Sequence, residues 1–148
     1  MRVQIRSDFS ARLQAQTELD RAVSVVKQKL GTAVFSEGEM SLAVVVGELL
    51  HARHRTVTTA ESCTAGLVAA MLTEVPGSSA WFLGGWVVYA NRMKTAALGV
   101  PDDLIAREGA VSEAVVRQMA VEALQRSAGD YALALTGVAG PEIGRAHV

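Results

Sequence analysis

The chain has 148 residues, with 14 basic against 15 acidic side chains and a formal net charge of −1. This balance argues against the basic surface with which proteins bind nucleic acid or an anionic membrane. The single cysteine, Cys63, excludes an intrachain disulfide. Apolar runs are too short to cross a bilayer, and charged residues interrupt the N-terminal segment where a signal peptide has its apolar core. We therefore expect a cytoplasmic protein, and a hydrophobic content of 50% is typical of one with a real core.

The first forty residues predict a small β-α-β module. Short strands are expected at residues 3–5 and 33–35, on either side of a helix over 13–30 whose apolar positions recur at helical spacing. A polar break at 36–39 separates this module from a second amphipathic helix over 42–50. The module is too small to hold a hydrophobic core by itself.

From residue 56 onward, predicted strands and helices alternate. The expected strands, rich in β-branched or other apolar residues, are 56–60, 86–89 and 131–135. The first expected helix covers 67–72 and is buried on most sides. A short helix capped by Asn91 carries Lys94, and another begins near Pro101. The last expected helix is capped by Ser112, and its inner face carries Val116, Met119, Ala120 and Ala123. This alternation predicts a three-layer α/β sandwich with a mostly parallel sheet.

Three polar clusters, residues 62–66, 89–94 and 136–140, follow the predicted strands, at the edge where open α/β sheets bind ligands. Ser62, between a strand and a helix, has backbone N–H groups nearby that suit an oxyanion. The alternative is that Ser62 or Thr64 is only a helix N-cap, as most such residues are. Lys94 can activate a serine only if burial or a nearby positive charge lowers its pKa, and otherwise it is a solvated surface lysine.

Other residues near these clusters have two interpretations each. Tyr89 either packs at the end of a strand or relays a proton. The glycine-rich turn after residue 135 can cradle a phosphate through its amides, although such turns are common. Cys63 is a rival nucleophile or an inert core thiol. His51 and His54 can share a helical face, but they lack a nearby third ligand, so we expect no metal site.

The run TTAESCTAGL at residues 58–67 resembles the hallmark of the CinA C-terminal domain family, which includes stand-alone amidases of the PncC type. Further similar motifs follow in the same order: VPGSSA (75–80), VYAN (88–91), Lys94, LGVP (98–101), GAVSE (109–113) and TGVAGP (136–141). The likeness covers about residues 40–141. Ordered motifs over this length are far more specific than any single glycine pattern.

The resemblance implies an amidohydrolase that needs no cofactor and converts nicotinamide mononucleotide and water to nicotinic acid mononucleotide and ammonia. It implies Ser62 as the nucleophile, Lys94 as its base and Tyr89 as a helper in proton transfer. The substrate-binding residues that it implies are Thr64, Ala65, Gly66, Ser79, Asn91, Thr136 and Gly137. We also expect a homo-oligomer when the protein is full length. The alternative is a non-catalytic nucleotide-binding or regulatory module of a competence- or damage-inducible protein.

The resemblance also predicts the domain organisation. Residues 1–38 resemble the end of the small KH-like domain of long CinA proteins, residues 39–141 the amidase domain, and residues 142–148 are expected to be a non-native tail. Relatives continue past the last motif with a further strand and helix, so we expect a fragment with a sheet incomplete on its C-terminal side. Many relatives have glycine where Ala65 stands and serine where Ala90 stands.

Overall fold

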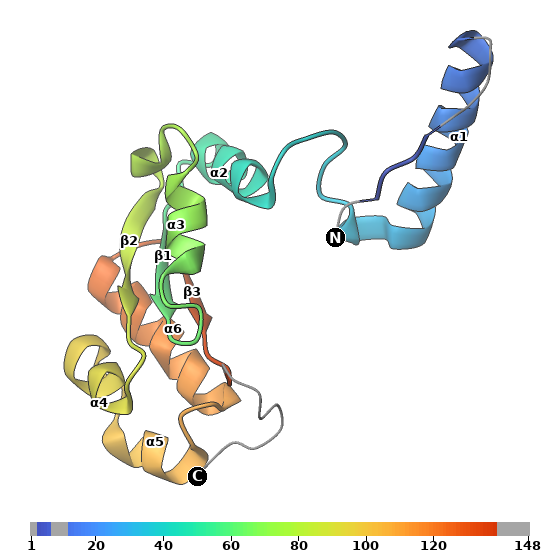
Figure 1. The fold of residues 1–148 in the computed structure, drawn as a ribbon. Coiled ribbons are helices and arrows are strands. Elements are labelled where there is room, and N and C mark those ends of the chain that lie inside the picture. The colour runs from blue at the N-terminus through green and yellow to red at the C-terminus, as the bar shows by residue number, and fades with distance from the viewer. Residues whose placement is uncertain (1–2, 7–11, 139–148) are drawn as a thin grey trace. The chain divides into compact units, whose positions relative to one another are not determined.

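The computed structural model describes residues 3–6 and 12–138, and the chain divides into two compact units, residues 1–42 (unit 1) and 43–148 (unit 2) (Figure 1). The tail expected at 142–148 lies outside the described residues. No helix in the described ranges is long and apolar enough to cross a membrane.

Unit 1 is built around one long helix, α1 (Arg12–Leu30), followed by a 3-10 turn over Gly31–Ala33. The expected helix is confirmed, but the two expected strands are wrong. Residues 3–6 and 34–36 belong to no strand. A strand needs a neighbour that pairs with its N–H and C=O groups, and no described segment of unit 1 supplies one.

Unit 2 contains a three-stranded parallel sheet with the order β2-β1-β3. Its strands are β1 (Val57–Glu61), β2 (Phe82–Val87) and β3 (Tyr131–Leu135). Strand β2 begins at Phe82 rather than at residue 86, because Gly84 and Gly85 belong to it. A Cβ on Gly85 would lie 2.0 Å from the hydroxyl oxygen of Thr59, so only glycine lets the two strands approach this closely.

Helices α3 (Leu67–Thr73) and α6 (Glu113–Ser127) lie along the sheet (Figure 1). The other helices around the sheet are α2 (Leu42–Ala52), α4 (Asn91–Met93), a π-helix over Lys94–Leu98 and α5 (Asp102–Glu108), and α4 and α5 lie beyond the carboxyl ends of the strands. Ala60 of β1 packs in the cluster that contains α6, whereas Val57 packs with Leu72 of α3. Positions 57 and 60 point to opposite faces of a strand, so α3 and α6 lie on opposite sides of the sheet. The predicted three-layer α/β arrangement is confirmed.

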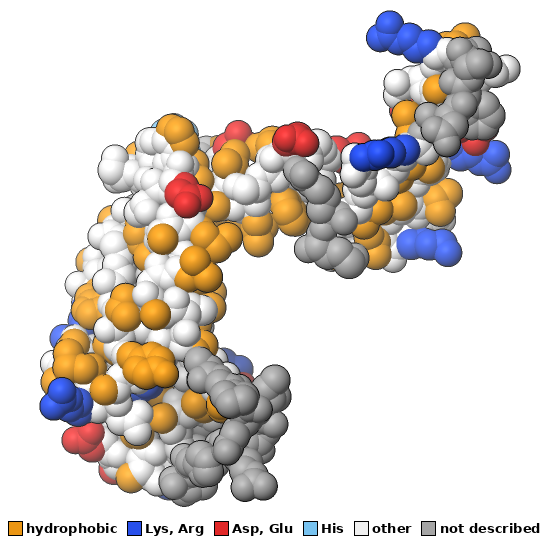
Figure 2. Space-filling model, viewed as in Figure 1, with side chains coloured by type: hydrophobic (Ala, Val, Ile, Leu, Met, Phe, Trp, Pro, Cys, Tyr) orange, Lys and Arg blue, Asp and Glu red, His pale blue; other side chains and the backbone are white. Residues whose placement is uncertain are grey.

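Two hydrophobic clusters hold the layers together. One lies between the sheet and α6, whose buried residues are Val115, Met119 and Ala123; of the expected inner face, Val116 and Ala120 are only partly buried. The other contains Trp81, which lies against Gly47 of α2. Helix α3 is less buried than expected, because only Leu72 is enclosed. Hydrophobic side chains are spread over the face that carries α3 and β2 (Figure 2), and the exposed ones on these elements are Leu67, Met71, Leu83 and Val87.

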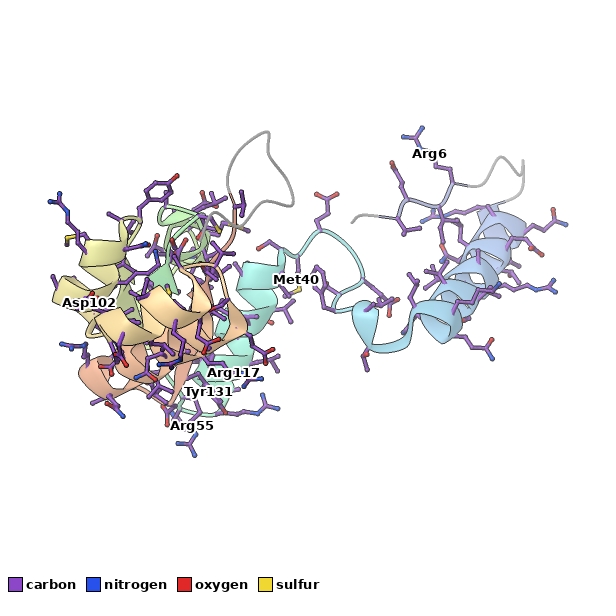
Figure 3. All side chains as sticks on the ribbon, turned by 90° about the horizontal axis from the view of Figure 1, so that it is seen from below. Arg6, Met40, Arg55, Asp102, Arg117 and Tyr131 are labelled. Carbon is purple, nitrogen blue, oxygen red and sulfur yellow. The ribbon has the colours of Figure 1, made fainter. Side chains whose placement is uncertain are left out.

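A polar network joins the starts of β1 and β3. The Asp130 carboxylate accepts hydrogen bonds from the amide and hydroxyl of Thr56 and from Arg55, and the Tyr131 amide donates to the Thr56 carbonyl. Figure 3 shows Arg55 and Tyr131 close together at this end of the sheet. The Thr56 amide and the Arg55 guanidinium lower the pKa of Asp130. The network fixes the register in which β3 adds to β1.

Candidate active site

All three strands end at one edge of the sheet, since they are parallel. Glu61 at the end of β1 is in register with Val87 of β2 and Leu135 of β3. The Ser62 amide donates to the Leu135 carbonyl at 3.0 Å, and the Val88 amide donates to the Glu61 carbonyl at 2.8 Å. The segments that follow the strands, and with them the three predicted polar clusters, are therefore brought to the same edge.

Ser62 and Lys94 meet directly at this edge. Lys94 Nζ lies 3.1 Å from Ser62 Oγ and donates to the carbonyl of Tyr89, also at 3.1 Å. Both side chains are buried, with 5% of Ser62 and 2% of Lys94 exposed. Burial lowers the pKa of Lys94, and the electrostatic interaction with Cys63 opposes this shift. No carboxylate in the described ranges forms an ion pair with Lys94. The interpretation of Lys94 as a solvated lysine is therefore wrong.

The backbone that carries Lys94 differs from the expected capped helix. Ala90, not Asn91, occupies the N-cap position of α4, and no side chain caps this helix. The helix then widens into the π-helix at Lys94, whose carbonyl accepts from the Val100 amide at 3.0 Å. Short π-helical turns occur often at functional sites, because they redirect a side chain from its helical position.

Ser62 is followed by a tight turn that leads into α3. The Ala65 amide donates to the Ser62 carbonyl, and Ala65 and Gly66 both adopt positive φ, +51° and +94°. The N-cap position of α3 is Gly66, without a capping side chain, so the N-cap interpretation of Ser62 and Thr64 is wrong. The Thr64 amide has no acceptor among the described residues.

A residue that the sequence did not single out caps α3 instead. Glu61, only 1% exposed, accepts hydrogen bonds from the amides of Gly66, Val68 and Ala69 at 3.1, 3.0 and 2.8 Å. Burial would raise the pKa of Glu61, but these amides and the nearby Thr64 hydroxyl outweigh it and lower the pKa. The hydroxyl lies beside the carboxylate without a well-formed hydrogen bond. The sequence signal for this role is an acidic residue at the end of a strand, five to eight positions before the first amides of a helix that has no other capping side chain.

The structure brings some of the other expected site residues to this edge. The Thr136 hydroxyl donates to the Ala110 carbonyl at 3.1 Å, which holds the segment after β3 in place. A Cβ on Gly137 would lie 3.1 Å from the sulfur of Cys63, so this segment packs against the Ser62 turn. Cys63 is a partly exposed free thiol.

Two other expected site residues are placed differently. The Tyr89 side chain is 64% exposed, and it is the Tyr89 backbone carbonyl, not the hydroxyl, that contacts Lys94. Ser79 precedes β2, so it lies at the opposite edge of the sheet from Ser62. Across the described residues, no group of three metal-ligating side chains is present.

A groove of about 670 Å³ lies on unit 1, along α1. Its walls are mostly apolar, with Gln16, Asp20, Lys27 and Glu37 as the longer polar side chains. None of the expected site residues lines it. The buried serine–lysine pair of unit 2 is therefore the stronger candidate for chemistry, because it combines a nucleophile with a base.

Comparison with known proteins identifies relatives of unit 2. Residues 39–148 match the model of the CinA C-terminal domain. The nicotinamide-nucleotide amidohydrolase PncC of Escherichia coli K12 is 50% identical over 105 residues, which are 71% of this chain and 64% of that relative. A putative competence-damage inducible protein of Symbiobacterium thermophilum is 50% identical over 119 residues, 80% of this chain but only 28% of that relative.

Solved structures give the same family. A competence-damaged protein (CinA) superfamily protein from Escherichia coli superposes with a TM-score of 0.68 at 30% identity, covering 78% of this chain and 70% of that one. The competence/damage inducible protein from Agrobacterium tumefaciens gives a TM-score of 0.65 at 39% identity, covering 75% of this chain and 70% of that one.

Proposed function

Because the chain belongs to the CinA C-terminal domain family, we propose that it is a nicotinamide-nucleotide amidase in which Ser62 attacks and Lys94 is the base. The observation that carries this proposal is the 3.1 Å contact between Lys94 Nζ and Ser62 Oγ, both buried at the ligand-binding edge of the sheet. The relative named nicotinamide-nucleotide amidohydrolase PncC supports the choice of substrate.

The first half of the reaction forms an ester on the enzyme. Neutral Lys94 takes the Ser62 hydroxyl proton as Oγ adds to the carboxamide carbon of nicotinamide mononucleotide. The developing oxyanion can accept from the backbone of the Ser62 turn, where the Thr64 amide has no protein acceptor among the described residues. Lys94 then returns its proton to the leaving nitrogen, the C–N bond breaks and ammonia departs.

The second half releases the product. Water attacks the ester carbonyl while Lys94 takes a proton from it, and the C–O bond to Ser62 breaks. Lys94 gives the proton back to Ser62 Oγ, which leaves nicotinic acid mononucleotide and the free enzyme. The depressed pKa of Lys94 suits both steps, because burial increases the fraction of neutral amine at a given pH.

The substrate is proposed to bind between the segments that follow the strands. Thr64, Ala65 and Gly66 in the Ser62 turn, Asn91 at the start of α4, and Thr136 and Gly137 after β3 would line it. Tyr89 would contribute through its exposed ring at the rim of the site rather than by a direct contact with Lys94. Ser79 has no place in this arrangement within one chain.

Two alternatives remain distinct in what they predict. A non-catalytic nucleotide-binding or regulatory module would bind a mononucleotide without releasing ammonia; the relatives named as competence-damage inducible or CinA-like proteins keep this alternative open. A thiol enzyme would use Cys63, whose sulfur lies against Gly137. Ammonia release from nicotinamide mononucleotide, measured with two single substitutions, distinguishes these three possibilities.

The test is ammonia release from nicotinamide mononucleotide by the purified chain and by two variants. Ser62→Ala should lower kcat by about 1,000-fold or more, because it removes the nucleophile. Cys63→Ala is the matched control, next in sequence, and should keep most of the activity. A parent chain that binds nicotinamide mononucleotide without releasing ammonia would favour the binding module. An active Ser62→Ala with an inactive Cys63→Ala would transfer the nucleophile to the thiol.

A further inference from the structure

We propose that Glu61 is a positioning residue that holds the Ser62 turn in its reactive geometry. This inference rests on the proposed role of Ser62 as nucleophile. Glu61 is the last residue of β1, and its carboxylate binds three amides at the start of α3. It therefore ties both ends of the turn that carries Ser62 to each other.

Glu61 acts from the opposite side of the strand to the chemistry. Its side chain points to the face covered by α3, whereas the next residue, Ser62, points to the other face and meets Lys94. Lys94 donates hydrogen bonds to Ser62 Oγ and the Tyr89 carbonyl, whereas the Glu61 carboxylate accepts from backbone amides. Glu61 thus has no direct contact with the reacting atoms and works through the backbone.

A buried carboxylate is an energetically unfavourable way to cap the seven-residue helix α3. It is 1% exposed, and no lysine or arginine of the described residues forms an ion pair with it. Burying a charge without a counter-charge is unfavourable, and an aspartate at the N-cap position would reach the Val68 and Ala69 amides from the surface, although not the amide of residue 66 itself. A function that needs a fixed distance between β1 and α3 explains why the chain uses Glu61 instead.

The turn itself needs such a restraint. Ala65 and Gly66 adopt left-handed conformations, which cost energy for an L-residue such as Ala65. Without the three bonds, the turn can relax and carry Ser62 away from Lys94. The two reacting groups are 3.1 Å apart, and a misplacement of about 1 Å at such a distance can lower a rate by about 100-fold.

The experiment compares the intact chain with its Glu61→Gln variant. Glutamine has nearly the same size as glutamate, but its side-chain NH2 group replaces one carboxylate oxygen. This group cannot accept hydrogen bonds from the backbone amides that now bind that oxygen. We expect the rate at which a fluorophosphonate labels Ser62 to fall by about 10- to 100-fold, and kcat for ammonia release to fall with it while KM changes little. Labelling needs only a reactive serine, so it tests the role of Glu61 without assuming a substrate. If the parent chain is labelled but releases no ammonia from nicotinamide mononucleotide, the proposed substrate is wrong and the role of Glu61 can still be tested.

Leu72→Ala is the matched control for a purely structural effect. Leu72 is buried at the other end of the same helix, so its truncation destabilises α3 without touching the turn. Per folded molecule, its labelling rate should equal that of the parent. Equal labelling rates in Glu61→Gln and the parent, or an equal fall in Leu72→Ala, would overturn the proposal.

Glu61→Asp keeps the test decisive if Glu61→Gln does not fold. Aspartate retains the charge, but its shorter side chain cannot reach all three amides. We expect the same slow labelling of Ser62 from this variant. A parental labelling rate would show that the negative charge alone matters, and would overturn the positioning role.

Discussion

Lys94 illustrates how burial changes the chemistry of a single residue. Its ammonium is enclosed with a hydroxyl and a carbonyl as partners and no carboxylate among the described residues. Desolvation penalises the charged form, which lowers the pKa of Lys94 below its ordinary value. The same burial that makes the lysine a base also costs stability whenever the side chain is protonated.

The pH dependence of activity should follow Lys94. Because the neutral amine is the base, kcat/KM should rise with pH and level off above the folded-state pKa of Lys94, below that of a free lysine. Lys94→Arg should be inactive across the whole pH range, since arginine stays protonated. A pH–rate profile of the parent and this variant checks both points. A parental profile that falls with pH over this window would contradict a lysine base.

The same shift predicts a change in stability. The unfolded chain binds the Lys94 proton more tightly than the folded chain, so the free energy of unfolding should rise with pH between the folded-state and ordinary pKa values of Lys94. Lys94→Met should lose this part of the slope. Urea unfolding of both proteins at several pH values isolates the contribution, because all other titrating groups are common to them.

At the scale of elements, close backbone approaches decide the packing of unit 2. Helix α2 packs closely against Trp81 at Gly47, where a Cβ would lie 2.6 Å from a ring carbon of the indole. Strand β2 likewise lies close to Thr59 of β1 at Gly85, where there is no room for a Cβ. Glycine is unfavourable in the interior of a helix or a strand, so local propensity does not explain Gly47 or Gly85. The reason for each glycine is visible only once the residue packed against it is known.

Gly47→Ala should therefore destabilise the protein although alanine is the better helix former. The gain in helix propensity is about 1 kcal/mol, whereas forcing a methyl group into Trp81 costs about 1–3 kcal/mol. We expect a net loss of about 1 kcal/mol in the free energy of unfolding, measured by urea denaturation. The control is Glu48→Ala at the exposed neighbouring position, which should change stability by less than about 0.5 kcal/mol. A more stable Gly47→Ala variant would contradict this packing.

At the scale of the whole molecule, the chain divides into two compact units. Both hydrophobic clusters and the serine–lysine pair use only residues from Ala43 onward. The family match begins at residue 39. We therefore propose that residues 39–148 carry the function and that residues 1–38 form a different domain.

A fragment of residues 39–148 should behave like the intact chain in its chemistry. Because its core and its site contain no residue of unit 1, we expect an unchanged kcat and an unchanged thermal midpoint for the transition that exposes Trp81. Calorimetry and ammonia release measure the two quantities. A fragment that loses activity while the intact chain keeps it would show that the site depends on unit 1.

By itself, the sequence determined the α/β class, the order of the elements of unit 2, and the residue types at the candidate site. Hydrophobic periodicity and ordered motifs are local properties, and they place Ser62, Lys94 and the Ser112 N-cap, which accepts from the Val115 amide as expected. The glycine that the resemblance predicts for many relatives at position 65 would suit this backbone, since Ala65 has φ +51°. The roles proposed for these residues remain predictions.

Only the tertiary structure decided which groups meet. The Gly84–Gly85 pair belongs to a strand because β1 lies beside it, and the segments at 3–5 and 33–35 are not strands because no described segment pairs with them. The placement of Ser79 at the far edge follows from parallel pairing, whereas the capping role of Glu61 and the contact of Lys94 with the Tyr89 carbonyl follow from turn conformations that the sequence pattern does not specify. Backbone hydrogen bonds between strands and the burial of charge depend on neighbours distant in sequence, which a local pattern does not contain.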